Sequence, residues 1–411
     1  MSTDLNNRPK LVSEFAARRK ATVIRSEEEA IAIAHDFAKL IASGAADRDR
    51  QRAVPLVELG QLAETGLLGI TVPAAYGGLG ASARTVAEVF RIIAEADPAI
   101  AQVPQNHFVF TDVVIHEGTQ EQKDELLAMV LEGKRFGNAL AERGTKHSGE
   151  RKTRIVPDKD GFRVNGTKYY CTGAYSSDII PVTALDAEGR PVVAYVDRNA
   201  PGVEVGQDWT AMGQRATISG TTVLDNVFVP KSRVIEHWRR YEAPQVHGAF
   251  AQIIHAAIFI GVGSAALKDG AAFVREKARP YFEAGVEKAG EDSLLLHQFG
   301  QLFATLHAAE ALLERAADTL DRAAANLNAE TAAAASIAVS EAKAFGGDTA
   351  VKIASDVFAL TGTSSADEKY RLDRHWRNVR THTLHDPARW KFWHVGNYHV
   401  NRKKPPSHGL I

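Results

Sequence analysis

The feature that most constrains the fold of this chain is a hydrophobic pattern whose period changes twice. Residues 1–137 have mainly the helical period, residues 138–238 form short alternating runs, and residues 239–411 return to the helical period. Helical and strand segments that are segregated along a chain are typical of α+β folds. The sequence therefore predicts a mainly helical α+β fold with an N-terminal helical domain, a central antiparallel β domain and a C-terminal four-helix bundle.

Local signals in the N-terminal region support this division. A capping-box pattern from Ser26 to Glu29 predicts the start of a helix, and further helices are expected over Val54–Thr65 and Ala83–Ala96. The stretch Val72–Gly80 is rich in glycine and proline, which favour turns over helix. We expect it to be a loop between helices.

The later regions carry strand signals and then helix signals. β-branched runs such as Val192–Val196 indicate strands. Turn residues separate these runs at Asp158–Gly161, Asp186–Gly189 and Pro201–Gly202. Asn165-Gly166 also favours a hairpin turn, after which a strand is expected to run to Gly173. After Pro244 come four or five long helical segments, including the Ala-rich run Ala332–Phe345, which predict an antiparallel bundle.

Charge and cysteine content exclude several classes of function. The 49 Lys and Arg nearly balance the 50 Asp and Glu without a basic stripe, so nucleic acid is not an expected partner. The longest apolar run, Ile253–Val262, is interrupted by His255 and is too short to span a bilayer. The polar N-terminus lacks a signal-peptide core, so we expect a cytoplasmic protein without membrane contact. The single Cys171 excludes an internal disulfide or thiolate metal site, so redox chemistry requires an organic cofactor.

The most polar cluster is RTHTLHDP at Arg380–Pro387. His382 and His385 lie three residues apart and are expected on one face of a helix that ends near Asp386, since proline follows. Imidazole donates, accepts or shuttles a proton near neutral pH. The alternative is an exposed helix end with ordinary surface histidines. No metal is expected, because no second group of ligands stands at suitable spacing.

The string GVGSAA at Gly261–Ala266 matches a dinucleotide-binding fingerprint in its final-alanine form. Such a site needs a preceding strand and a repeated βα pattern, yet residues 250–277 have the pattern of one helix. We therefore favour small residues that let two helices approach closely, with a nicotinamide site as the alternative.

Taken in order, these segments resemble the acyl-CoA dehydrogenase superfamily from about residue 55 to about residue 400. Leu67–Ile70 with the loop that follows resembles its N-terminal signature. Asn165–Lys168 with Thr172-Gly173 is similar to its flavin-facing β segment, and Asp225–Pro230 to the strand that leaves the β domain. The resemblance implies a flavoenzyme in which Thr172 lies beside the reactive edge of the flavin ring.

The dehydrogenases of this superfamily need a carboxylate base, normally a glutamate at one of two places. The first place falls near Ala249–Gln252, which carries no acid. The second falls on Leu384–Pro387, where Asp386 is the candidate for a shortened base and His385 indicates another branch. An acyl-CoA dehydrogenase that uses Asp386 is therefore one alternative function, and a flavin-binding protein without turnover is a second.

The other branch comprises flavin monooxygenases similar to dibenzothiophene monooxygenase and the related oxidoreductases of bacterial sulfur acquisition. The string Trp376–Pro387 resembles their hallmark. The same branch is indicated by Phe136–Leu140, His107, Asp208–Gly213, Thr361–Thr363 and the tail from Gly396 to Pro406. The resemblance implies reduced FMN from a separate reductase, reaction with oxygen to a C4a-hydroperoxide, oxidation of a small organosulfur compound, and a homotetramer. Phe299-Gly300 leaves FAD as the alternative cofactor.

Residue by residue, the resemblance implies that His107 and His385 hydrogen-bond to the peroxy group and protonate it. It implies that Asn138 and Thr172 hold this group against the flavin. The other residues expected at the cofactor are Gly173, Trp209 against the ring, His382, and Arg279 at the phosphate across a subunit interface. His107 and Trp209 as core residues, and Arg275 in place of Arg279, remain alternatives.

Overall fold

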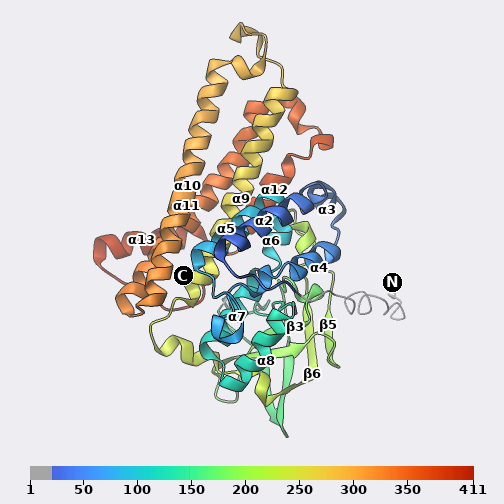
Figure 1. The fold of residues 1–411 in the computed structure, drawn as a ribbon, viewed down its shortest axis with the longest axis vertical. Coiled ribbons are helices and arrows are strands. Elements are labelled where there is room, and N and C mark those ends of the chain that lie inside the picture. Colours follow the sequence, from blue (N-terminus) through green and yellow to red (C-terminus); the bar gives the residue numbers. More distant parts are fainter. Residues whose placement is uncertain (1–20, 148) are drawn as a thin grey trace.

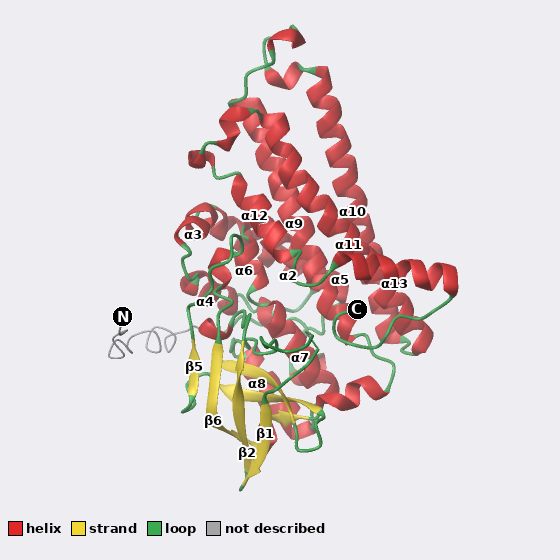
Figure 2. Cartoon of the chain, turned by 180° about the vertical axis from the view of Figure 1, so that it is seen from behind, coloured by secondary structure: helices red, strands yellow, loops and turns green. Residues whose placement is uncertain are grey.

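The computed structural model describes residues 21–147 and 149–411. Figure 1 shows a tall group of helices at one end of the molecule and the sheet at the other. The first N-terminal helices lie between the two, and the later ones lie beside the sheet. Colouring by secondary structure makes the separation of helices and strands plain (Figure 2). The segregation predicted from the change in hydrophobic period is therefore confirmed.

The N-terminal region is helical, and helices form at the three places where local signals predict them. The helices of this region are α2 (Glu27–Ala42), α3 (Ala45–Gln51), α4 (Leu56–Glu64), α5 (Ala83–Ala96), α6 (Pro98–Gln102), α7 (Gln105–Glu117) and α8 (Gln120–Leu131). The side chain of Ser26 accepts a hydrogen bond from the backbone of Glu29 and so caps α2. The predicted range of α5 is confirmed, and the expected loop Val72–Gly80 contains only a short 3-10 turn.

The central sheet has the order β5-β6-β2-β1-β3-β4-β7. Its strands are β1 (Arg154–Asp158), β2 (Gly161–Lys168), β3 (Ile179–Leu185), β4 (Pro191–Asp197), β5 (Val203–Val205), β6 (Thr222–Pro230) and β7 (Val234–Ile235). All pairings are antiparallel except the one between β1 and β3, which touch in parallel at Arg154 and Leu185. The β2–β3 connection returns the chain beside β1 in the same direction, which explains this exception.

The prediction of a hairpin turn at Asn165-Gly166 is wrong. Both residues lie inside β2, where the register against β6 shifts between Val164 and Gly166. A Cβ atom on Gly166 would lie 2.2 Å from the hydroxyl oxygen of Thr153. Gly166 therefore lies in a β-bulge where another part of the chain comes too close for a side chain.

The C-terminal helices are α9 (His247–Glu276), α10 (Ser293–Ala325), α11 (Ala329–Thr361), α12 (Asp373–His382) and α13 (Ala388–Asn401). The GVGSAA string lies inside α9 with no strand before it, so it is not a dinucleotide site. A Cβ atom on Gly261 would lie 2.5 Å from the backbone oxygen of Arg91 on α5. The prediction that small residues let helices approach closely is therefore confirmed.

α9 is the central helix of this bundle. By length and composition alone it would suffice to cross a membrane, but 94% of its most apolar window is buried inside the protein. Its buried side chains belong to one apolar cluster that also contains residues of α2, α5, α10 and α11. The N-terminal helices and the bundle therefore share a core, which fixes their relative position.

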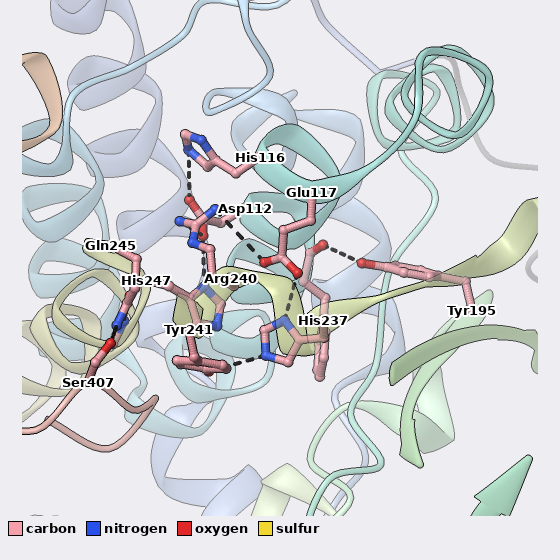
Figure 3. Close-up of polar contacts among 12 residues, drawn as sticks. Asp112, His116, Glu117, Tyr195, His237, Arg240, Tyr241, Gln245, His247 and Ser407 are labelled. Atoms are coloured by element: carbon pink, nitrogen blue, oxygen red, sulfur yellow. Dashed lines mark hydrogen bonds and ion pairs between the residues drawn. The ribbon is translucent and has the colours of Figure 1, made fainter. Parts of the chain in front are cut away.

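A buried polar cluster ties the start of α9 to α7 (Figure 3). We call Asp112, Glu117, His237, Arg240 and His247 the anchor cluster. Asp112 pairs with His247 at 2.7 Å and with Arg240 at 3.3 Å, while Glu117 pairs with His237 at 2.8 Å. His237 and Arg240 lie on the segment that leaves β7, so the cluster joins the sheet, α7 and the bundle at one point.

Candidate active site

The β domain meets the bundle around Gln214. The backbone N–H of Gln214 donates to the side-chain oxygen of Asn378 on α12 at 2.7 Å. Its side-chain amide donates to the backbone oxygen of Pro98, at the start of α6, at 3.1 Å. Next to it, a Cβ atom on Gly213 would lie 1.9 Å from the backbone oxygen of Arg377. One residue of the β domain thus contacts both helical regions, and several of the predicted site residues lie around it.

Thr172 and Trp209, both predicted from the resemblance, are connected through this point. The hydroxyl of Thr172 lies 2.7 Å from that of Ser219, and the hydroxyl of Ser219 lies 2.8 Å from that of Thr217. Thr217 and the indole N–H of Trp209 both donate to the backbone oxygen of Gln214, at 2.9 and 2.8 Å. A chain of hydroxyl groups therefore runs from the expected flavin-facing segment to the junction.

The backbone around this chain is strained. Tyr170, Gln214 and Ile218 all have positive φ, at 57°, 48° and 45°, a conformation that costs a non-glycine residue roughly 1–3 kcal/mol. Gly173 has φ 80°, which glycine adopts without that cost. Strained residues that gather at one place are typical of functional sites, where surrounding contacts hold an otherwise unfavourable shape.

Two buried amide oxygens remain unsatisfied beside this chain. Asn138 is 8% exposed and its amide N–H donates to the backbone oxygen of Tyr170 at 3.3 Å. Oδ1 of Asn138 and Oε1 of Gln214 have no hydrogen-bond partner among the residues that the structure describes. Buried acceptors of this kind call for a ligand with donor groups. The ring of Trp209 packs edge-on to that of Tyr170, with the ring centres 6.2 Å apart. The two amide oxygens fit the polar edge of a flavin ring, and the Trp209 ring fits its flat face.

Three histidines lie on the bundle side of the junction. Nδ1 of His255, on α9, lies 2.8 Å from Nε2 of His382, and the rings of His255 and His385 are 4.2 Å apart with a 35° tilt. His255 and His382 are buried, whereas the side chain of His385 is 37% exposed. Burial lowers the pKa of His255 and His382 well below the usual range, so both are uncharged near pH 7. Desolvation by its neighbours also lowers the pKa of His385, although Asp386 opposes this shift.

The prediction of one helix face for His382 and His385 is wrong. α12 ends at His382, and His385 follows in a turn. The backbone N–H of His385 donates to the backbone oxygen of His382. The helix thus stops four residues before Asp386. The two rings are connected instead through His255, which comes from another helix.

Asp386 is held between two buried lysines. It accepts from Lys343 and lies 3.2 Å from Nζ of Lys391, and these three side chains are between 3% and 8% exposed. Burial opposes its ionisation, but the two ammonium groups hold the pKa of Asp386 well below its usual range. Burial in turn lowers the pKa of Lys343 to about 8. Nδ1 of His385 lies 3.8 Å from the carboxylate, so Asp386 is a fixed negative charge beside that ring.

A small hollow opens next to this group. It is lined by Phe259, Lys343, Ala344, Gly347, Asp348, Thr383, Asp386, Ala388 and Lys391. Asp386 therefore lies at the edge of this hollow, whereas His385 is not among its lining residues.

His107 lies apart from these histidines in a closed environment. It is 1% exposed, Nδ1 accepts from the backbone N–H of Phe136 at 3.0 Å, and Nε2 lies 3.0 Å from the backbone oxygen of Leu68. Burial lowers the pKa of His107 to about 4. Both ring nitrogens are occupied, which supports the alternative of a core histidine over a proton donor. Its bond to Phe136 positions the segment that carries Asn138.

Arg279 lies far from the junction. It is exposed in the segment between α9 and α10, at the free tip of the bundle, and the alternative Arg275 lies nearby in the last turn of α9 (Figure 1). Phe299-Gly300 belongs to the start of α10 near the same tip. Within one subunit none of these residues reaches Gln214, so a role for Arg279 at flavin phosphate requires a neighbouring subunit.

The sequence did not identify Gln214, His255, Lys343 or Lys391 as site residues. Two of them carried a recognisable signal. His255 interrupts the longest apolar run, Lys343 is the one basic residue of the Ala-rich run, and both are buried. A lone polar side chain in an apolar helix must find a partner inside the fold. Gln214 and Lys391 lie in short segments of mixed polar and apolar residues, where no such contrast marks them.

Comparison with known proteins agrees with this architecture. Family models of the acyl-CoA dehydrogenase N-terminal, middle and C-terminal domains match residues 25–134, 139–227 and 253–390. Dibenzothiophene monooxygenase of Rhodococcus erythropolis is 32% identical over 92% of this chain and 95% of its own length. The probable FMNH2-dependent monooxygenase SfnC of Pseudomonas putida is 30% identical over 92% of this chain and 96% of its own.

Solved structures show the same likeness. FMN-bound TdsC of Paenibacillus sp. A11-2 has a TM-score of 0.89 at 28% identity, over 93% of this chain and 100% of its own. Methanesulfinate monooxygenase MsuC of Pseudomonas fluorescens has a TM-score of 0.86 at 28% identity, over 93% and 99%. The chain therefore belongs to the acyl-CoA dehydrogenase family, in the branch of flavin monooxygenases that contains dibenzothiophene monooxygenase.

Proposed function

We propose that this chain is a monooxygenase that uses reduced FMN and oxidises a small organosulfur compound. The names of its relatives support a sulfur substrate, since both dibenzothiophene and methanesulfinate contain sulfur. The observation that carries the proposal is the make-up of the junction. Uncharged imidazoles lie where a dehydrogenase needs a free carboxylate, and the carboxylate beside His385, that of Asp386, is neutralised by Lys343 and Lys391.

When bound, reduced FMN supplies two electrons and, through a C4a-hydroperoxide formed with dioxygen, one oxygen atom for the sulfur, while the other oxygen leaves as water. The chain itself orients the reactants. Asn138 and Thr172 provide the amide and hydroxyl groups beside the expected ring edge, and Trp209 covers its face. His385 is the partly exposed imidazole that can hold or pass on a proton.

The first alternative is an acyl-CoA dehydrogenase with Asp386 as base. A base must take up a proton, and the two ammonium groups that keep Asp386 ionised also make it a poor proton acceptor. The second alternative is a flavin-binding protein without turnover. The strained backbone and the unsatisfied acceptors of Asn138 and Gln214 favour a working site over a passive one.

An acyl-CoA titration and a turnover assay separate these functions. Protein loaded with oxidised FMN is mixed anaerobically with a series of acyl-CoA esters, and flavin absorbance is followed. We expect no bleaching, whereas a dehydrogenase reduces its flavin without oxygen or a reductase. With a flavin reductase, NADH, oxygen and a sulfinate or sulfide, we expect product that contains one atom of ¹⁸O from ¹⁸O2. A protein that binds FMN but gives neither result would be the passive flavin binder.

The proposal includes a homotetramer in the cytoplasm that meets a separate reductase transiently. α13 supports an assembly, because it starts next to Asp386 and leaves Trp390, Phe392, Trp393 and Val400 largely exposed. An apolar face of this kind marks an interaction surface. We expect the double substitution of Trp390→Glu and Trp393→Glu to lower the mass of the assembly measured by light scattering. An unchanged mass would contradict a role of this face in assembly.

A further inference from the structure

The direction of the hydrogen bonds at the junction can be worked out from one amide. Nε2 of Gln214 lies 3.1 Å from the backbone oxygen of Pro98. A carbonyl oxygen only accepts, so the amide atom that faces it must be the nitrogen. The same nitrogen lies 3.5 Å from Nδ1 of His382, towards which it can only donate. The contact with Pro98 therefore sets which way the side chain of Gln214 points, and His382 receives a donor.

This donor determines the tautomer of both histidines that follow. Since Nδ1 of His382 accepts, the proton of the neutral ring is on Nε2. That N–H lies 2.8 Å from Nδ1 of His255, which must then accept, so His255 also carries its proton on Nε2. Burial lowers the pKa of both rings, which keeps them neutral and the order of donors intact. The tautomer of each ring is thus fixed by the hydrogen bond between that ring and the preceding group.

The end of this relay lies against His385. Among the described residues Nε2 of His255 has no hydrogen-bond partner, and its ring stacks on that of His385 at 4.2 Å. The carboxylate of Asp386, 3.8 Å from Nδ1 of His385, favours a proton on that nitrogen and leaves Nε2 of His385 as an acceptor. The two neighbouring rings therefore differ in their roles: Nε2 of His255 can donate a hydrogen bond, and Nε2 of His385 can accept one.

We propose that Gln214 and His382 are positioning residues that fix His255 as an Nε2–H donor, and that His255 orients His385 by stacking. The inference rests on the proposed function, because it names which ring supplies a hydrogen bond to the reactants and which receives one. Gln214 belongs to the β domain, His382 to α12 and His255 to α9. The proton position on His255, and through this ring the orientation of His385, therefore depend on correct docking of the β domain on the bundle.

Neutron diffraction from deuterium-exchanged crystals of the full protein tests the relay without turnover. We expect deuterium on Nε2 of both His255 and His382, and on the amide nitrogen of Gln214 that faces Pro98. Deuterium on Nδ1 of either histidine would overturn the relay. This result does not depend on the reaction, so it remains decisive if the chain proves to have another activity.

Two variants of His382 test whether the relay matters for chemistry. In His382→Gln an amide N–H can still reach Nδ1 of His255, whereas His382→Phe keeps the ring volume and removes the donor. We expect the Gln variant to keep kcat within about threefold of the parent and the Phe variant to lose at least about tenfold, with KM and FMN affinity little changed in both. Equal kcat in the two variants would overturn the positioning role.

His375→Gln is the matched control. His375 is a buried histidine on the same helix α12, and its ring bonds to Asp269 at 2.8 Å outside the relay. We expect this variant to lose stability and keep the kcat and the pH profile of the parent. A pH profile shifted in His382→Phe but not in His375→Gln separates a change in proton order from a general loss of packing.

Discussion

At the scale of single residues, His107 shows how a histidine can serve a site without entering the chemistry. Its two ring nitrogens bond to the backbone of Leu68 and Phe136 and so fix the loop that carries Asn138. A side chain of this kind acts through the position of its neighbours. Its substitution should therefore change stability and flavin affinity more than the chemical step.

We expect His107→Phe to lower the free energy of unfolding by about 2–4 kcal/mol, because two buried backbone groups lose their partners. His107→Gln retains one donor and one acceptor and should cost less. FMN affinity, measured by fluorescence quenching, should fall more in His107→Phe than in His107→Gln, as stability does. The kcat of both variants at saturating FMN should stay within about threefold of the parent. A stable His107→Gln protein with a 100-fold lower kcat would instead restore His107 as a proton donor.

Asp386 allows a prediction from charge. Asp386→Asn leaves Lys343 and Lys391 buried without a counter-ion, so it should lower the free energy of unfolding by about 3–5 kcal/mol. Lys343→Met leaves one Asp–Lys pair intact and should cost less. Urea unfolding of both variants tests this order. Equal stability of Asp386→Asn and the parent would show that the lysines are not held by this carboxylate.

The sequence allowed part of the site to be predicted at this scale. Asn138, Thr172, Trp209 and His385 stand in strings that resemble the family, and the structure brings them to the same junction. Gln214 and His255 could not be predicted as partners of His382. They lie 168 and 127 positions from it in the sequence. Docking of the β domain brings Gln214 to His382, and packing of α9 against α12 inside the bundle brings His255 to it.

At the scale of secondary structure elements, local signals were sufficient where caps and period agreed, as in α5. They failed where one residue type serves two purposes. Asn165-Gly166 fits a hairpin turn and a β-bulge equally well, and pairing with β6 decides between them. The end of α12 was misplaced because proline at position 387 only limits where a helix can stop, while the turn after His382 stops it earlier.

Two helical glycines give a matched pair of predictions. Gly261 packs against α5, whereas a Cβ atom added to Gly300 on α10 would meet no other atom within 4 Å. Gly300→Ala should raise stability by about 0.5–1 kcal/mol through helix propensity alone. Gly261→Ala gains the same propensity but forces α5 and α9 apart, so we expect a net loss of about 1–3 kcal/mol. Thermal unfolding of both variants checks the sign, and two increases in Tm would contradict close packing at Gly261.

At the scale of the whole molecule, the protein buries several uncharged histidines, which makes its stability depend on pH. His107 has a folded pKa of about 4, whereas the unfolded chain binds that proton near pH 6.5. Below pH 6.5 the unfolded state therefore binds more protons, and the free energy of unfolding falls as the pH falls. His107 alone accounts for a loss of about 3 kcal/mol between pH 6.5 and 4.

The measurement is Tm as a function of pH from 7.5 to 5. We expect Tm to fall with pH in the parent and to fall less in His107→Gln. His35→Gln removes an exposed histidine and should follow the parent. A parent Tm that stays constant over this range would contradict the burial of neutral histidines.

The arrangement of the domains explains why the site lies where it does. The shared core of α2, α5, α9, α10 and α11 fixes the bundle, and the anchor cluster fixes the segment that leaves the sheet. Gln214 can then bond to both α12 and the start of α6. The histidines, the strained loops and the unsatisfied amide oxygens meet at this one junction.

The central claim is that this junction activates oxygen on reduced flavin. The most direct test is to reduce the FMN-loaded protein anaerobically, mix it with oxygenated buffer in a stopped-flow instrument, and follow absorbance. We predict a C4a-hydroperoxyflavin that persists without substrate and decays faster when an organosulfur compound is added. Immediate return of oxidised FMN without an intermediate, at a rate that no sulfur compound changes, would contradict the claim.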